Sequence, residues 1–134
     1  MATARLFVAE GARLAITGRD QIRLDAARQE LGCEVVAISA DTTDVEAMEA
    51  AVAIVVEKLG NLDVVFANAG INGVTSLEKT TLSTFEEIVK INLTGVFFTV
   101  QATVPYLNNG ASVVLNSSAL SVLGAPGYSA YAPR

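Results

Sequence analysis

Apolar residues along this chain follow two patterns that alternate. In some stretches they recur three and four positions apart, as do Val45, Met48 and Val52, which is typical of a helix with one buried face. In others they form short continuous runs such as Val64-Val65-Phe66, which favour buried strands. The pattern predicts helices at residues 3–10, 20–31, 44–60 and 83–106. It predicts strands at residues 13–17, 34–38, 62–66 and 112–116.

Polar residues and glycines mark the predicted boundaries. Asp20 and Asp44 stand where an N-cap is expected, and Ser83 with Glu86 three residues later forms a capping-box pattern. Asn108-Asn109-Gly110 predicts a turn before the last strand. Glycines close the first three helices, at Gly11, Gly32 and Gly60.

Strict alternation of helices with continuously apolar strands is typical of a parallel sheet covered on both faces. We therefore expect residues 1–134 to form one α/β domain with a doubly wound, Rossmann-like parallel sheet. The sequence shows no repeat or linker that would divide it.

Composition narrows the class of protein. Of 134 residues, 51% are hydrophobic and 17% are charged, which suits one well-buried core. Polar residues interrupt every apolar run, and the start lacks a signal peptide's apolar region, so we expect a cytoplasmic protein without a membrane partner. The chain has no His, so no metal site is expected, and Cys33 is expected to be buried. A net charge of −5 argues against a nucleic-acid partner.

Polar and small residues gather at the ends of the predicted strands. Ligands of open α/β sheets bind outside the carboxyl ends of the strands. The residues at those ends are Gly18-Arg19, Asp41-Thr42, Asn68-Ala69-Gly70 and Ser117-Ser118.

Asn92 lies within the apolar stripe of the predicted helix 83–106, between Ile88 and Val96. A buried amide at this position needs hydrogen-bond partners. Asn92 either serves a functional site or satisfies a local kink of the helix, and both interpretations remain open at this stage.

Together these motifs carry a family resemblance. Ser118 precedes Tyr131 by thirteen residues, and Asn68-Ala69-Gly70 and Asn92-Leu93-Thr94-Gly95 precede them in order. The chain thereby resembles the classical short-chain dehydrogenase/reductase family, whose members transfer hydride between NAD(P)(H) and a small alcohol or carbonyl substrate.

The resemblance implies a role for each residue. Tyr131 would exchange the proton of the substrate oxygen, Ser118 would hydrogen-bond that oxygen, and Asn92 would hold a water that leads to a lysine. A phenol in water ionises only near pH ~10, so it needs neighbouring positive charge to act as a base. Tyr128 fits the serine spacing less well and is expected to pack or face the substrate.

The same resemblance gives a cofactor site of Arg19, Asp41, Thr42, Asn68, Ala69 and Gly70. Asp41 would hold the adenine ring, although an Asp before a helix also serves as a turn former. At the strand end where NAD-dependent members carry an acid, this chain has Arg19, which suits a 2′-phosphate and favours NADP over NAD. Asp20 could neutralise Arg19, and Arg19 could also be a solvated surface residue.

Two parts of the family pattern are missing from the printed sequence. The first strand with its glycine-rich turn has no counterpart before residue 3, and the family's lysine would follow Arg134. Ala132-Pro133-Arg134 resembles instead a segment that precedes the family's sixth strand. We therefore expect an enzyme of this family with impaired turnover. Two other interpretations stay open: a non-catalytic nucleotide-binding or oligomerising remnant of the family, and an inert product.

In the family's strand order the missing strand lies between strands 13–17 and 62–66. The sequence therefore predicts either direct pairing of these two strands, in the order 2-1-3-4, or a second chain that fills the gap. A homo-oligomer is favoured, because Val96, Phe97, Val100 and Val104 resemble the family's dimerising helix.

Overall fold

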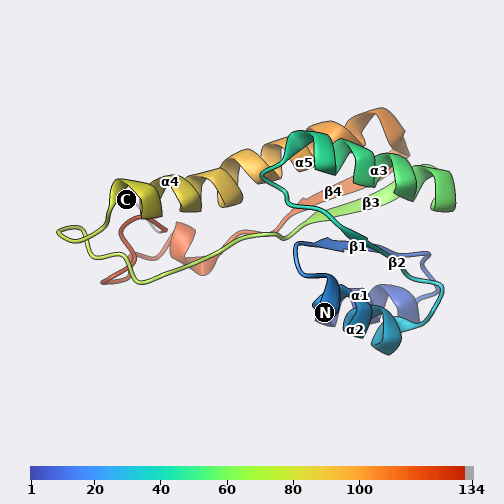
Figure 1. Cartoon of the computed structure of the whole chain (residues 1–134), viewed down its shortest axis with the longest axis horizontal. Coiled ribbons are helices and arrows are strands. Elements are labelled where there is room, and N and C mark those ends of the chain that lie inside the picture. Colours follow the sequence, from blue (N-terminus) through green and yellow to red (C-terminus); the bar gives the residue numbers. More distant parts are fainter. Residues whose placement is uncertain (132–134) are drawn as a thin grey trace.

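The computed structural model describes residues 1–131 and has three layers, with strands between two groups of helices (Figure 1). The helices are α1 (Ala2–Ala9), α2 (Gln21–Leu31), α3 (Val45–Leu59), α4 (Leu82–Val89) and α5 (Val96–Thr103). The strands are β1 (Ala15–Gly18), β2 (Val36–Ser39), β3 (Leu62–Ala67) and β4 (Leu107–Leu115). The predicted α/β alternation is confirmed, whereas the expectation for Ala132-Pro133-Arg134 lies outside the described residues.

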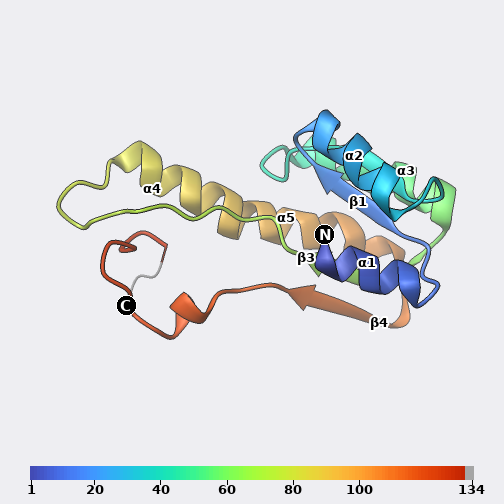
Figure 2. The same cartoon turned by 90° about the horizontal axis from the view of Figure 1, so that it is seen from below.

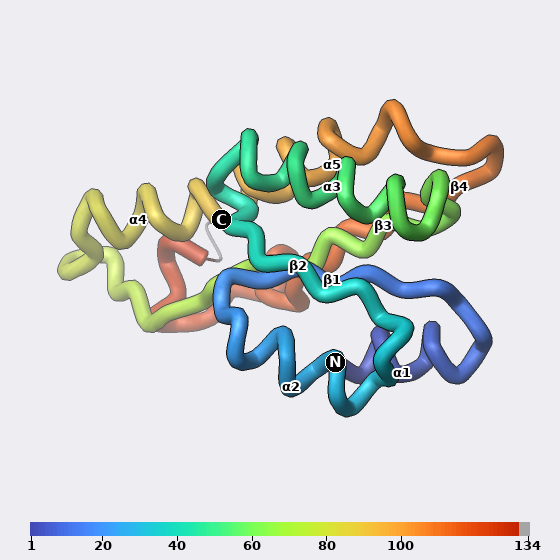
Figure 3. Tube along the Cα trace, turned by 45° about the vertical axis from the view of Figure 1, so that its right-hand side comes forward, coloured from blue at the N-terminus to red at the C-terminus, as the bar shows by residue number. Residues whose placement is uncertain are grey.

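The strands form two separate parallel pairs. β1 pairs with β2, and β3 pairs with β4. Within residues 1–131, β1 and β3 share no ladder, so direct pairing in the order 2-1-3-4, the less favoured of the two alternatives, is wrong. Each pair has its own covering helix: α2 packs on β1 and β2, and α5 packs on β3 and β4 (Figure 3).

Helix packing joins the two halves. α3 lies on β2 and also packs against α5 on the same side of the molecule. The most deeply buried side chains of α3, Met48 and Ala51, contact Ala40 just after β2, with Ile38 packed against them. This cluster fixes the carboxyl end of β2 relative to the helical layer.

Side-chain caps begin α2 and α3 as expected. Asp20 accepts a hydrogen bond from the Arg23 backbone N–H at 3.1 Å, and Asp44 accepts one from Ala47 at 3.0 Å. The predicted cap at Ser83 is wrong. Thr81 has extended backbone angles and caps α4, because its hydroxyl accepts from the Thr84 N–H at 3.2 Å.

The long predicted helix is continuous from Leu82 to Tyr106 but changes geometry along its length. Between α4 and α5 it is a π-helix, Lys90–Gly95, and it ends in the 3₁₀ turn Val104–Tyr106. Contrary to the sequence-based expectation, this helix is long and apolar enough to cross a membrane by length and composition alone. Because α5 packs on α3 and β3, we assign it to the covering layer of the sheet.

Two local expectations are corrected. Asn108-Asn109-Gly110 lies within β4 instead of forming a turn before it, because the β3–β4 register is irregular between Leu62 and Val64 and accommodates the extra residues as a bulge. Gly110 has φ 83°, which explains the glycine there. Cys33 is exposed, because it follows the end of α2 in a surface turn.

Candidate active site

Asn92 joins the π-helical segment to the loop after β3. Its side-chain Oδ1 accepts a hydrogen bond from the Ile71 backbone N–H, and its Nδ2 donates to the Ile71 carbonyl, both at 2.8 Å. The predicted need for partners is met by another segment of the chain. Asn92 therefore does more than relieve a kink within its own helix, because it fixes the course of the loop that carries Asn68-Ala69-Gly70.

Two glycines allow this close packing. A Cβ atom on Gly70 would lie 3.3 Å from Asn92 Oδ1. A Cβ on Gly95 would lie 3.0 Å from Thr42 Oγ1 and 3.1 Å from the Thr42 carbonyl oxygen. Gly95 therefore lets the π-helical segment approach the loop after β2, so the strand-end loops around Thr42 and Asn68 both depend on that segment.

One cavity of about 580 Å³ collects most of the predicted site. Its wall includes these predicted residues: Asn68, Ala69, Gly70, Asn92, Ser118 and Tyr131. Asn116 also lines it and donates from Nδ2 to Asn68 Oδ1 at 2.8 Å, which ties the end of β3 to the end of β4. Asn116 was not predicted as a site residue, although its place at the carboxyl end of the predicted strand 112–116 was a usable signal.

Ser118 begins a short 3₁₀ turn after β4. Its hydroxyl oxygen accepts from the Leu120 backbone N–H at 3.2 Å, and its carbonyl accepts from Ser121 Oγ at 2.7 Å. The hydroxyl proton of Ser118 takes no part in the first bond, since the oxygen is the acceptor there. It can therefore be donated to an oxygen atom in the cavity.

Thr75 fixes the segment that leads to Tyr131. Only 2% of its surface is exposed, and its backbone N–H donates to the Gly127 carbonyl at 2.6 Å. Its hydroxyl accepts from the Ala130 N–H at 3.1 Å, while its carbonyl accepts from both the N–H and the hydroxyl of Ser129. Figure 2 shows this part of the chain returning from β4 toward the α4 end of the molecule. Thr75 could not be recognised from sequence patterns, because its partners lie more than fifty residues away.

Tyr128 takes part in the same junction. It forms an isolated parallel bridge with Thr75, and its carbonyl accepts from the Tyr131 N–H at 3.0 Å. Tyr128 thus belongs to the backbone turn that presents Tyr131, and it is not among the residues that line the 580 Å³ cavity.

Arg19 and Asp41 face each other at the ends of β1 and β2. Arg19 Nη1 lies 3.8 Å from Asp41 Oδ2, with 60% and 38% of the two side chains exposed. Asp41 Oδ1 accepts from the Thr43 N–H at 2.8 Å, and this bond, aided by Arg19, holds the pKa of Asp41 below its usual value. Asp20, which the sequence left open as a partner of Arg19, has other partners in the structure. It caps α2 and pairs with Arg23 at 3.4 Å.

A second, larger cavity of about 1380 Å³ lies between the strand pairs. Arg19 and Thr42 line it, and Asn68 and Ala69 line both cavities. The two cavities share Asn68 and Ala69 in their walls, and together they are lined by every predicted cofactor residue except Asp41. The Arg19 guanidinium, 60% exposed, lines the larger cavity, whereas amide and hydroxyl groups line the smaller one.

Comparison with known proteins identifies the family. The family model described as short chain dehydrogenase matches residues 1–133. The chain belongs to this family.

Individual relatives agree with this assignment. Oxidoreductase asL5 of Sarocladium schorii is 36% identical over 132 residues, which is 97% of this chain and 53% of that protein. An uncharacterized NAD-dependent oxidoreductase of Mycobacterium tuberculosis is 38% identical over 104 residues, or 75% of this chain and 38% of that protein. A crystal structure of a short-chain dehydrogenase/reductase from Brucella melitensis matches with a TM-score of 0.94 and 31% identity, over 98% of this chain and 56% of that chain. The Rossmann-like α/β fold is therefore established, and the chain spans about half the length of such relatives or less.

Proposed function

We propose that this chain carries one wall of an NADP(H)-dependent oxidoreductase site for a small alcohol or carbonyl substrate. The family acts on substrates of this class, and the observation that supports the proposal is the shared cavity of Asn92, Ser118 and Tyr131. Ser118 donates its hydroxyl proton to the substrate oxygen, and the Tyr131 hydroxyl exchanges a proton with the same oxygen.

Asn92 acts mainly by holding another segment of the chain in place. Both polar groups of its side chain are occupied by Ile71, so it keeps the loop Asn68-Ala69-Gly70 at the mouth of the cavity. The water bridge to a lysine is proposed at the backbone of Asn92, where the π-helix alters the regular hydrogen-bond pattern.

Arg19, Asp41, Thr42, Asn68, Ala69 and Gly70 would hold the cofactor, which supplies the hydride when bound. Arg19 favours NADP because a guanidinium binds a 2′-phosphate through charge-assisted bonds. Its present partner Asp41 is more than a third exposed, so the pair is weak and a phosphate competes with it. NAD remains the alternative, and one relative is named as NAD-dependent.

Fusion of this chain to the missing family segments tests the proposal. We expect the fusion, supplied with a glycine-rich turn and a lysine, to oxidise NADPH in the presence of a simple ketone and to lose this turnover in Tyr131→Phe. A fusion that binds NADPH but stays inactive would instead favour the non-catalytic nucleotide-binding remnant.

The 134-residue chain alone is proposed to be impaired. The printed residues include neither a glycine-rich pyrophosphate turn nor a lysine four positions after Tyr131. We expect no appreciable turnover with NADPH and ketones in a steady-state assay, and turnover abolished by Tyr131→Phe would contradict this.

We also propose a cytoplasmic homo-oligomer that associates through α5. Phe97 of α5 and Val104, which directly follows α5, are 61% and 55% exposed, and the centroids of the Phe97 and Phe98 rings lie 5.3 Å apart edge to face, so this end of the helix presents an apolar surface. Light scattering at micromolar concentration is expected to give a mass above that of one chain, and a cooperatively melting monomer would exclude the oligomer.

A further inference from the structure

Thr75 is a buried polar residue in a loop whose apolar residues are exposed. It lies between β3 and α4, and only 2% of its surface is accessible. Val74 and Leu77 of the same loop are 80% and 81% exposed. Since the threonine is buried and its apolar neighbours are not, hydrogen bonds and not apolar packing hold Thr75 in place.

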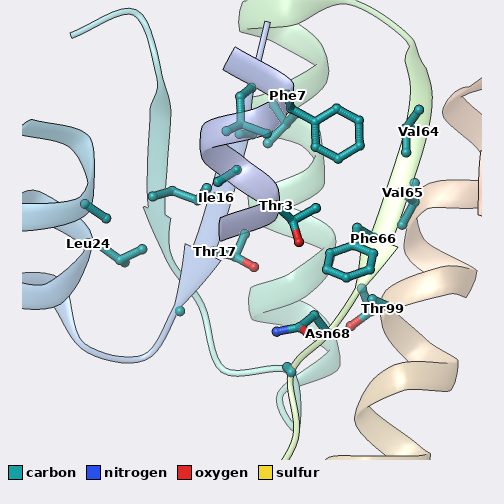
Figure 4. Close-up of a pocket in the computed structure, with 18 of the residues that line it drawn as sticks. Thr3, Phe7, Ile16, Thr17, Leu24, Val64, Val65, Phe66, Asn68 and Thr99 are labelled. Atoms are coloured by element: carbon teal, nitrogen blue, oxygen red, sulfur yellow. The ribbon is translucent and has the colours of Figure 1, made fainter. Parts of the chain in front are cut away.

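The loop that carries Thr75 is anchored at its start. It begins at Asn68, which directly follows β3 at the border of the large cavity (Figure 4). Asn92 then binds the backbone of Ile71, four residues before Thr75. Thr75 is therefore presented by a loop whose path is already fixed by the long helix Leu82–Tyr106.

Three residues of the segment after β4 bind Thr75. Gly127 and Ser129 bind its backbone, and the Ala130 N–H donates to its hydroxyl oxygen at 3.1 Å. Figure 1 shows where the two segments meet, with the red segment beside the yellow-green loop at the α4 end of the molecule. The bond from Ala130 is the one among these that depends on the Thr75 side chain.

The Ala130 bond acts on the backbone that presents Tyr131. Ala130 directly precedes Tyr131 and is itself only 7% exposed. Because a peptide unit is planar, a hydrogen bond to its N–H holds the whole unit in one orientation. The Thr75 hydroxyl therefore fixes the direction in which the chain enters Tyr131.

Ser118 is held by a different attachment. Its hydroxyl oxygen accepts from the Leu120 N–H within the 3₁₀ turn that follows β4. Ser118 and Tyr131 line one cavity, but only Tyr131 depends on the bond between Thr75 and Ala130. Loss of the Thr75 hydroxyl should therefore move Tyr131 relative to Ser118.

We propose that Thr75 is a positioning residue, whose hydroxyl places the Tyr131 phenol beside Ser118 by holding the N–H of Ala130. This inference rests on the proposed function, in which the hydroxyl groups of Ser118 and Tyr131 act on the same substrate oxygen. Proton exchange requires the phenol oxygen to lie about 3 Å from that oxygen. A displaced phenol therefore slows the chemical step without altering the cofactor wall.

Amide exchange measured by NMR tests the hydroxyl bond in the 134-residue chain. We expect slow exchange at Ala130 in wild type, exchange faster by about tenfold or more in Thr75→Val, and recovery in Thr75→Ser, which keeps the hydroxyl. The Tyr131 ring signals should shift in Thr75→Val and return in Thr75→Ser.

Thr80→Val is the matched control. Thr80 Oγ1 donates to the Ser76 carbonyl at 2.6 Å, so this variant also loses a hydroxyl bond of the same loop. It should leave the exchange of Ala130 and the ring signals of Tyr131 unchanged.

Steady-state kinetics of the fusion with the missing family segments measure the effect on the reaction. Thr75→Val should lower kcat for a simple ketone, expressed per NADPH-binding site, by about tenfold or more. The Kd of NADPH should change little, because the loop at Gly70 is held by Asn92. Thr75→Ser should recover most of kcat, and Thr80→Val should keep it.

Three results would overturn the proposal. They are an Ala130 amide that exchanges in wild type as fast as in an unfolded chain, equal shifts of the Tyr131 signals in Thr75→Val and Thr80→Val, and full kcat in Thr75→Val. The first result needs no variant, so the proposal can be refuted even if Thr75→Val does not fold. A wild-type fusion without turnover would contradict the proposed function, whereas amide exchange and the Tyr131 signals would still decide whether Thr75 places Tyr131.

Discussion

The amide of Asn92 holds the backbone of Ile71 through two hydrogen bonds of 2.8 Å. These bonds connect a π-helical turn with a loop 21 residues earlier in the chain. One side chain therefore couples the shape of the covering helix to the position of the loop Asn68-Ala69-Gly70.

Asn92→Leu should destabilise the chain by about 1–3 kcal/mol, because the Ile71 N–H and C=O lose their partners in a partly buried position. Urea unfolding measures this. Asn109→Leu, at an exposed position of β4, serves as the control and should change the free energy of unfolding little. Equal effects of the two substitutions would contradict the role of the Asn92 bonds.

Gly95→Ala should cost about 1–3 kcal/mol, since its Cβ would lie 3.0 Å from Thr42 Oγ1 and 3.1 Å from the Thr42 backbone oxygen. Gly73→Ala is the matched control, because nothing lies within 4 Å of a Cβ there. Thermal unfolding of both variants compares them. If Gly95→Ala were as stable as Gly73→Ala, the π-helical segment and the loop at Thr42 would move apart without loss of unfolding free energy. That result would contradict the prediction.

Asp41 should stabilise the folded state at neutral pH and lose this effect in acid. Its pKa is lowered in the folded state, first by the Thr43 N–H, so the stabilisation is present above the unfolded pKa and disappears as the pH falls through the folded pKa. Wild type should exceed Asp41→Asn in unfolding free energy at pH ~7, and the difference should shrink toward pH ~3. If the difference in unfolding free energy between wild type and Asp41→Asn did not change with pH, the effect would come from the shape of the side chain and not from its charge.

Arg19 should determine cofactor preference in the completed fusion. Arg19→Ala is expected to weaken NADPH binding about 10-fold or more and to leave NADH nearly unchanged, because only NADPH carries the 2′-phosphate. Isothermal titration with both cofactors measures this. Arg23→Ala is the control, since Arg23 pairs with Asp20 and its side chain is 88% exposed. Unchanged preference in Arg19→Ala would remove Arg19 from the site.

The sequence predicted the elements well where local chemistry decides them. Asp20 and Asp44 were expected caps and are confirmed, because a carboxylate placed before an apolar stripe bonds the first free N–H groups regardless of tertiary context. The predicted cap at Ser83 is wrong, because Thr81 offers the same hydroxyl group two residues earlier. The path of the loop that enters α4 selects between the two residues.

Hydrogen bonds between segments that are distant along the chain were harder to predict from the sequence. The partners of Asn92 and of Thr75 lie in segments distant along the chain, and no periodicity encodes them. One cavity is lined by residues that the family motifs had indicated, namely Asn68, Asn92, Ser118 and Tyr131. The space between β1 and β3 was expected either to close by direct pairing or to be filled by a second chain, and within residues 1–131 the two strands share no ladder.

The separate strand pairs also bear on how the chain folds. β1 and β2 are joined through an 11-residue helix, whereas β3 and β4 must close a connection that contains the 25-residue helical segment Leu82–Tyr106. Because longer closures lose more chain entropy before any ladder forms, the β1–α2–β2 unit can assemble first and the β3–β4 unit later. Within residues 1–131 no ladder bond joins β1 to β3, so the contact of α3 with α5 is the packing through which the two strand pairs can unfold together.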